Sequence, residues 1–173
     1  KGIFNYLLGE GSVTGNYLVK HPGIAKIAFT GSSVTGAKIM SESALSGLKP
    51  VHLELGGKSP QVVFDYIDDI DATVSKIAAG MYVNSGQVCT SGTRLIAHKK
   101  IVNELVDRLI DIGSKKVPGL TWDDKTTLPP IVSKKQAERI DVLISKSVEM
   151  GANIISGGNS VSYTHLTLPT NTV

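Results

Sequence analysis

The sequence lacks the features that hold secreted proteins together or carry a chain across a membrane. It has one cysteine, Cys89, in 173 residues, so no internal disulfide and no cysteine-based zinc site can form, and we predict no metal site. We therefore expect a reducing compartment, the cytoplasm first among them. No run of about 18 apolar residues occurs and the start, Lys1 to Tyr6, lacks the parts of a secretory signal, so no membrane partner is expected.

Charge of one sign is also scarce. The formal net charge is +3, and the lysines and arginines are scattered. We expect the short lysine pairs to lie at solvated helix ends rather than on a nucleic-acid surface, and no nucleic-acid partner is predicted. An initiator methionine is missing as well, which predicts that the chain comes from a longer protein.

Apolar runs and helical patterns predict an α/β protein. With 41% hydrophobic residues the chain can bury a sizeable core, as one domain or as pieces of two. In the first half, short apolar runs alternate with helical patterns, which is typical of a parallel sheet. Strands are expected over Ile3–Leu8, Ala25–Thr30 and Val51–Leu55, and helices over Val13–Lys20 and Val34–Leu45.

The second half continues with strands and longer helices. The predicted strands are Gln61–Phe64, Thr93–His98 and Asn153–Ser156, and the predicted helices are Ala72–Val83, Ile101–Lys115 and Ser133–Met150. Two of these helices carry start signals. The acidic run from Asp68 to Asp71 suits a helix N-terminus, and Ser133 with Gln136 three residues later has a capping-box pattern.

The turn from Phe29 to Gly36 is a candidate phosphate site. It falls where a strand ends and a helix begins, so backbone N–H groups and the helix dipole point toward an anion placed there. The lysine that a Walker A loop needs directly after its second glycine is missing. Taken alone, the turn is also consistent with an ordinary connection in which Ser32 or Ser33 caps the helix.

Glu54 and Cys89 are side chains with reactive chemistry near the ends of elements. Glu54 lies in the apolar run Val51–Leu55, where a carboxylate must face solvent at a sheet end or a functional cavity. Cys89 follows 35 positions later, after the breaker Asn84–Gln87. A free cysteine is often a small buried apolar residue, but these flanks are polar, and nearby backbone N–H donors would favour a nucleophilic thiolate.

The histidines do not supply an evident partner for the cysteine. His21 precedes a proline turn, His98 ends a predicted strand beside two lysines, and His165 lies near the C-terminus. His52 shares a face of its strand with Glu54, because the two are two residues apart. We expect a structural role for His52.

Three motifs, in this order, resemble those of the NAD(P)-dependent aldehyde dehydrogenase family. They are Phe29–Ser32, Leu53–Pro60 and Gly86–Cys89. The segment Leu128–Ser133 resembles a further family landmark, with Leu-Pro-Pro where Gly-Pro-Leu is more usual. The resemblance extends from Lys1 to about Gly158.

The resemblance implies a role for each matching residue. Cys89 would attack the aldehyde carbon to give a thiohemiacetal and, after hydride transfer to NAD or NADP, a thioester. Glu54 would activate the water that hydrolyses this thioester, and the backbone N–H of Cys89 would supply half of the oxyanion hole. The residues implied in cofactor binding are Thr30, Gly31, Ser32, Leu55 and Gly56.

The family also implies an organisation of the chain. Residues 1–55 would be the second half of a Rossmann-like parallel-sheet cofactor domain, and residues 56–158 the first part of an α/β catalytic domain. Family members are near three times this length, so we expect a fragment of a homo-oligomeric parent, inactive on its own. Residues 159–173 are rich in Thr, Ser and Asn and do not resemble the family, and we expect an artefact or a disordered end.

Two other functions stay open at this point. One is a structural or binding relative of the family without catalysis, against which the presence of both Glu54 and Cys89 argues. The other is an aldehyde dehydrogenase that transfers the acyl group to coenzyme A. Such enzymes share the thioester step but usually lack the glutamate that Glu54 matches, so Glu54 favours hydrolysis.

Overall fold

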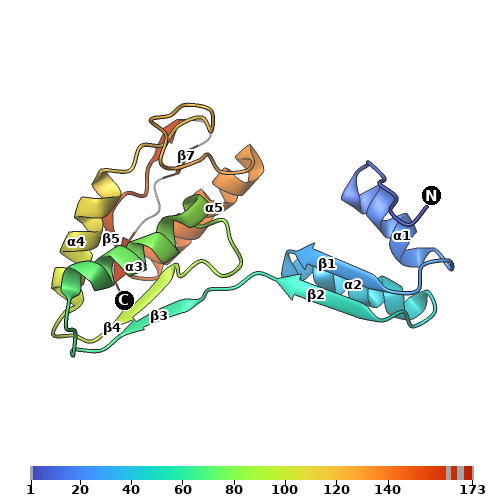
Figure 1. The fold of residues 1–173 in the computed structure, drawn as a ribbon, viewed down its shortest axis with the longest axis horizontal. Coiled ribbons are helices and arrows are strands. Elements are labelled where there is room, and N and C mark those ends of the chain that lie inside the picture. Colours follow the sequence, from blue (N-terminus) through green and yellow to red (C-terminus); the bar gives the residue numbers. More distant parts are fainter. Residues whose placement is uncertain (1, 163–164, 167–169, 173) are drawn as a thin grey trace. The chain divides into compact units, whose positions relative to one another are not determined.

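The structure is a computed structural model that describes residues 2–162, 165–166 and 170–172. The chain forms two compact units, an N-terminal unit (Lys1–Gly57) and a C-terminal unit (Lys58–Val173). Each contains a pair of parallel strands joined through a helix (Figure 1). This arrangement confirms the predicted α/β class. The assignment of residues 1–55 and 56–158 to a cofactor and a catalytic domain stays a prediction.

The N-terminal unit is a strand–helix–strand motif with a helical segment before it. Strands β1 (Ile27–Gly31) and β2 (Val51–Leu55) are parallel, and α2 (Ser33–Leu45) connects them and packs against both. The predicted helix over residues 13–20 consists of a π-helical turn, η1 (Gly11–Gly15), that continues into α1 (Asn16–Lys20). The helix α1 contacts α2.

Alternation along β2 determines which of its side chains face the helix. Val51, Leu53 and Leu55 are half-buried, whereas His52 and Glu54 are exposed. Gly36 of α2 lies against the apolar side, since a Cβ placed there would be 2.8 Å from Leu55 Cδ2. A glycine at this position therefore lets the helix approach the strand closely.

The strand predicted over Ile3–Leu8 is wrong. The segment forms no helix or strand, and its large apolar side chains are exposed, Ile3 at 99% and Phe4 at 86%. An apolar run becomes a strand only when a neighbour supplies ladder hydrogen bonds, and no described strand pairs with this one.

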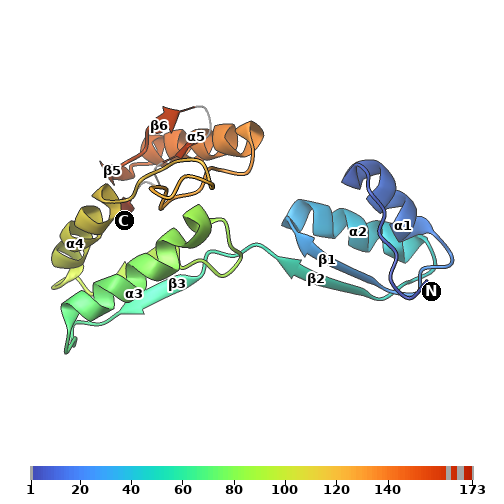
Figure 2. The same cartoon turned by 45° about the horizontal axis from the view of Figure 1, so that its top comes forward.

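The main core of the C-terminal unit lies between two helices and a parallel strand pair. Strands β3 (Pro60–Val63) and β4 (Arg94–Ala97) are joined through α3 (Ile70–Tyr82), and α4 (Val102–Ser114) packs beside α3 (Figure 2). The buried apolar residues of this core are Val74, Ile77, Ala78, Met81, Leu105 and Leu109.

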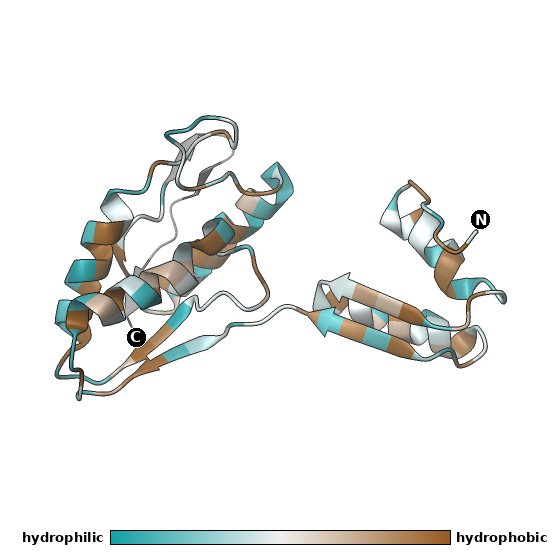
Figure 3. Ribbon diagram, viewed as in Figure 1, coloured by the Kyte–Doolittle hydropathy of each residue, from teal (hydrophilic) through white to brown (hydrophobic). Residues whose placement is uncertain are grey.

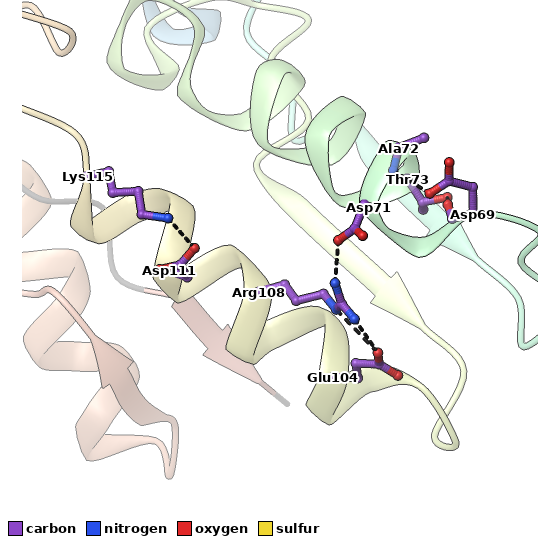
Figure 4. A network of polar contacts seen from close by, with 8 residues as sticks. All are labelled: Asp69, Asp71, Ala72, Thr73, Glu104, Arg108, Asp111 and Lys115. Carbon is purple, nitrogen blue, oxygen red and sulfur yellow. Dashed lines mark hydrogen bonds and ion pairs between the residues drawn. The ribbon is translucent and has the colours of Figure 1, made fainter.

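Polar side chains link α3 and α4 on the solvent side of this core. Along α4, apolar and hydrophilic residues alternate in the way expected of an amphipathic helix (Figure 3). Arg108 bonds to Glu104 one turn earlier, with Nη2 2.9 Å from Oε1, and to Asp71 of α3 (Figure 4). The bond to Glu104 is the main reason that the pKa of Arg108 is raised.

Both predicted helix caps in this unit are present. Asp69 accepts a hydrogen bond from the N–H of Ala72 at the start of α3, with Oδ1 2.9 Å from the nitrogen. Ser133 Oγ accepts from the N–H of Gln136, 3.2 Å away, at the start of α5 (Lys134–Glu149). These bonds satisfy N–H groups that have no acceptor within the helix.

The end of the chain contains short strands. β5 (Asn153–Ser156) pairs antiparallel with β8 (Thr170–Thr172), and β6 (Ser160–Ser162) with β7 (His165–Leu166). The rest of the segment for which an artefact or a disordered end was predicted, residues 163–164, 167–169 and 173, lies outside the described residues.

Candidate active site

Most of the predicted site residues of the N-terminal unit gather at the carboxyl ends of its two strands. Thr30 lies opposite Glu54 in the parallel register, and Gly31 lies opposite Leu55. Gly56 follows directly, and a Cβ placed on it would meet no atom within 4 Å. In open parallel sheets, ligands bind in the crevice beyond this edge. The backbone here is accessible to a ligand.

Ser32 connects β1 to α2 and caps the helix. Its Oγ accepts a hydrogen bond from the N–H of Thr35 at 3.2 Å and lies 2.9 Å from the Thr35 hydroxyl. The sequence left open whether this turn is a phosphate site or an ordinary cap. The structure shows the cap. Because one side chain satisfies only some of the free backbone N–H groups in the first turn of α2, the cap does not exclude an anion at the helix N-terminus.

Glu54 and His52 form a pair on the exposed face of β2. Glu54 Oε1 lies 3.2 Å from His52 Nε2, and the side chains are 65% and 64% exposed. The prediction that they share a face is therefore confirmed. The sequence allowed Glu54 to face either solvent at a sheet end or a functional cavity. In its own unit Glu54 faces solvent, so the carboxylate needs no buried partner.

Cys89 lies in a loop that begins with three residues of unusual backbone conformation. After α3, the turn η2 (Val83–Gly86) has φ values of 48° at Asn84, 54° at Ser85 and 72° at Gly86. Left-handed geometry is costly for residues other than glycine, so contacts with the surroundings must hold it. Cys89 itself is exposed, as a nucleophile must be to reach a substrate.

Side chains of this loop fasten it to the segment before α5. Ser85 Oγ donates to the carbonyl of Pro129 at 2.6 Å, and Gln87 Nε2 donates to the carbonyl of Pro130 at 3.1 Å. The N–H of Val132 donates to Gln87 Oε1 at 2.9 Å. We call these three bonds the Gln87 clamp. The segment 128–133, which resembles a family landmark, is thus directly joined to the cysteine loop.

The far side of the loop is held by Gln61 of β3. Its Nε2 donates to the carbonyl of Gly92 at 2.7 Å and to that of Ile77 in α3 at 3.0 Å. The N–H of Gly92 donates in turn to the carbonyl of Gly80, also in α3, at 3.0 Å. The loop that carries Cys89 is therefore fixed at its start to the segment before α5 and at its end to β3 and α3.

The structure divides the predicted residues between its two units. Glu54 and the predicted cofactor residues belong to the N-terminal unit, and Cys89 belongs to the C-terminal unit. Sequence reasoning missed Gln61 and the part that Ser85 and Gln87 play in the clamp. The only local signal was the position of Ser85 and Gln87 among the breakers before Cys89.

Two further features bear on the chemistry. Among the described residues, no group of three or more His, Cys, Asp or Glu side chains could hold a metal ion. Within that same part of the chain, no helix has the length and apolar character to cross a membrane.

The model of the aldehyde dehydrogenase family matches residues 1–170, so the chain belongs to that family. This confirms the resemblance found in the sequence. The match continues past Gly158, where that resemblance ended, into the segment that was predicted to lie outside the family.

Individual relatives agree with this assignment. The chain is 43% identical over 159 residues to a Staphylococcus aureus (strain MSSA476) protein named "Putative aldehyde dehydrogenase", an alignment that covers 91% of this chain and 33% of that protein. A crystal structure of an NAD-dependent aldehyde dehydrogenase from Sinorhizobium meliloti superposes with a TM-score of 0.92 at 34% identity, covering 98% of this chain and 34% of the other.

A betaine aldehyde dehydrogenase variant from Staphylococcus aureus, solved in complex with NAD+, has a TM-score of 0.84 at 32% identity. That superposition covers 89% of this chain and 30% of the other. The present chain thus spans about a third of the length of these relatives.

Proposed function

We propose that the chain is part of an enzyme that oxidises an aldehyde to a carboxylic acid with NAD+ or NADP+. The observation that carries this proposal is an exposed Cys89 on a loop fastened at both ends, in a member of the aldehyde dehydrogenase family. An exposed and positioned thiol suits a nucleophile better than a packing residue.

Cys89 would act first. Its thiolate attacks the aldehyde carbon, forming a carbon–sulfur bond and an oxyanion. The backbone N–H of Cys89 makes no hydrogen bond within the described residues, so it is available to the developing oxyanion. A donor in such a position contributes about 3–4 kcal/mol to transition-state stabilisation in measured cases.

The N-terminal unit carries residues that fit a dinucleotide. A Cβ at Gly36 would collide with Leu55, so the helix approaches the strand end more closely than other residues would allow, and Gly56 leaves its backbone uncovered. Ser32, Thr30 and Gly31 stand beside the N-terminus of α2, which favours a pyrophosphate. When bound, NAD+ or NADP+ would accept a hydride from the substrate carbon.

Glu54 would act last. After the hydride has left, the acyl group remains on the Cys89 sulfur as a thioester. Glu54 takes a proton from a water molecule, the resulting hydroxide attacks the acyl carbon, and the thiolate of Cys89 leaves. Glu54 is exposed on its own unit, so a water molecule can reach the carboxylate.

Pre-steady-state kinetics of the full-length protein that carries these residues tests the mechanism. We expect Cys89→Ala to abolish NADH or NADPH formation from an aldehyde. Glu54→Gln should retain one turnover of reduced cofactor per site but lower steady-state turnover about 10²–10⁴-fold, because only hydrolysis loses its base. Unchanged turnover in both variants would remove the two residues from the mechanism. Stimulation of the unaltered protein by coenzyme A would favour acyl transfer instead.

A further inference from the structure

His52 is bonded to the proposed base but has no part in the mechanism so far. Its Nε2 lies 3.2 Å from Glu54 Oε1. The two side chains belong to one strand and are two residues apart, so the backbone itself holds them on the same face. This contact does not depend on a flexible loop.

The neighbouring strand leaves this pair undisturbed. Ala28 lies opposite His52 in the parallel register and Thr30 lies opposite Glu54. Alanine has no polar atom to compete for the imidazole, and its small side chain leaves space beside the ring. Within the described residues, His52 is the only side chain that makes a hydrogen bond to Glu54.

We propose that His52 is a positioning residue for Glu54, an inference that rests on the proposed role of Glu54 as the base. The Nε2–H of His52 donates to Oε1 and thereby fixes the orientation of the carboxylate. The second oxygen, Oε2, then takes the proton from the attacking water. The expected structural role of His52 is thereby extended to the hydrolysis step.

Few other charges face the pair. On the β1 side, Lys26 precedes the strand on the same alternation as Ala28. The helix α2 packs against the opposite face of the sheet, where it carries Lys38 and Glu42. Glu42 is paired with Lys20, 3.0 Å away, so its charge is compensated there.

Two substitutions in the full-length protein test the hydrogen bond that His52 donates. His52→Gln supplies an amide N–H at a similar reach, whereas His52→Leu supplies no donor. We measure reduced-cofactor formation by stopped flow and acid release by quenched flow in single turnovers. We expect His52→Leu to slow acid release about 10-fold, and His52→Gln to restore it to within about 3-fold of the unaltered protein. Hydride transfer should be unchanged in both variants.

Several results would overturn the proposal. They are unchanged acid release in His52→Leu and equally slow acid release in the two variants. Should His52→Leu fail to fold, His52→Ala takes its place as the variant without a donor. Glu54→Gln in the same assay separates a failure of the proposed function from a failure of this inference. Normal acid release in Glu54→Gln would refute the proposed role of Glu54 as the base. Slow acid release in Glu54→Gln together with normal acid release in His52→Leu would refute only the positioning role of His52.

Discussion

At the scale of single residues, two glycines in the C-terminal unit face the same glutamine from different distances. A Cβ placed on Gly92 would lie 2.6 Å from Gln61 Cγ, whereas a Cβ on Gly80 would lie 3.5 Å from its amide atoms. The first distance is a clash, and the second is an ordinary contact. Gln61 holds the carbonyl of Gly92, so the clash falls on a bond that fixes the cysteine loop.

The substitution Gly92→Ala should therefore destabilise the protein, whereas Gly80→Ala should not. Displacing Gln61 costs about 1–3 kcal/mol through overpacking and lost hydrogen bonds. Alanine in the helix interior at Gly80 gains up to about 1 kcal/mol in propensity. Thermal unfolding of the two variants beside the unaltered full-length protein measures the difference. Equal midpoints for the two variants would show that Gln61 moves aside without cost.

Local residue chemistry was predictable where both partners lie within one turn of chain. Ser133 and the acidic run at Asp69 were expected to cap helices, and each bonds to an N–H three residues later. The bonds of Gln87 to residues 130 and 132 were not predicted. They join segments more than 40 residues apart in the sequence. Neither periodicity nor motif spacing in a single sequence shows which distant segments come into contact.

At the scale of elements, the Gln87 clamp predicts how the cysteine loop responds to mutation. Gln87→Leu removes the donor to Pro130 and the acceptor for the N–H of Val132, whereas Gln87→Glu keeps an acceptor for Val132 alone. We expect kcat of aldehyde oxidation to fall in the order unaltered, Glu, Leu, because misplacement of a nucleophile by about 1 Å costs as much as 100-fold.

Steady-state kinetics together with circular dichroism checks this order. Native spectra in both variants would assign any loss to the position of Cys89 rather than to unfolding. Full activity in Gln87→Leu would show that Ser85 and Gln61 suffice to hold the loop.

The helix α5 offers a test of its cap with the same substitution at two sites. Ser133→Ala removes the acceptor for the N–H of Gln136 and should cost about 0.5–2 kcal/mol. Ser147 Oγ instead donates to the carbonyl of Leu143 inside the helix, at 2.8 Å. That bond is not needed by the helix, so Ser147→Ala should be neutral or slightly stabilising. Denaturant unfolding compares the two, and a greater loss at Ser147 would contradict the cap assignment.

Elements were predicted well where the chain marks both of their ends. Val51–Leu55 was expected as a strand and forms β2 with the same bounds, because Pro50 and Gly56 limit it on either side. The apolar run Ile3–Leu8 has no pairing strand among the described residues, and it forms no strand itself. A strand forms only when a second segment pairs with it, and the residues of the strand itself do not show which segment that is.

At the scale of the whole molecule, the division of the candidate residues between two units limits what this chain can do alone. Glu54 with the predicted cofactor residues belongs to one unit and Cys89 to the other, and the chain spans about a third of the length of its relatives. Large apolar side chains of the N-terminal unit are exposed, among them Phe4, Tyr6 and Leu8. Such surface is typical of a segment that packs against further protein.

We therefore expect the isolated 173-residue chain to form no reduced cofactor from an aldehyde, at concentrations where the full-length protein turns over readily. Its exposed Cys89 should still react with a thiol reagent, since exposure does not require the rest of the protein. The deciding measurement is whether NAD+ protects this thiol from the reagent. We expect protection in the full-length protein and none in the isolated chain, because a dinucleotide site needs more than one strand–helix–strand motif. Reduced cofactor produced by the isolated chain, absent from its Cys89→Ala variant, would show that these two units hold a complete active site.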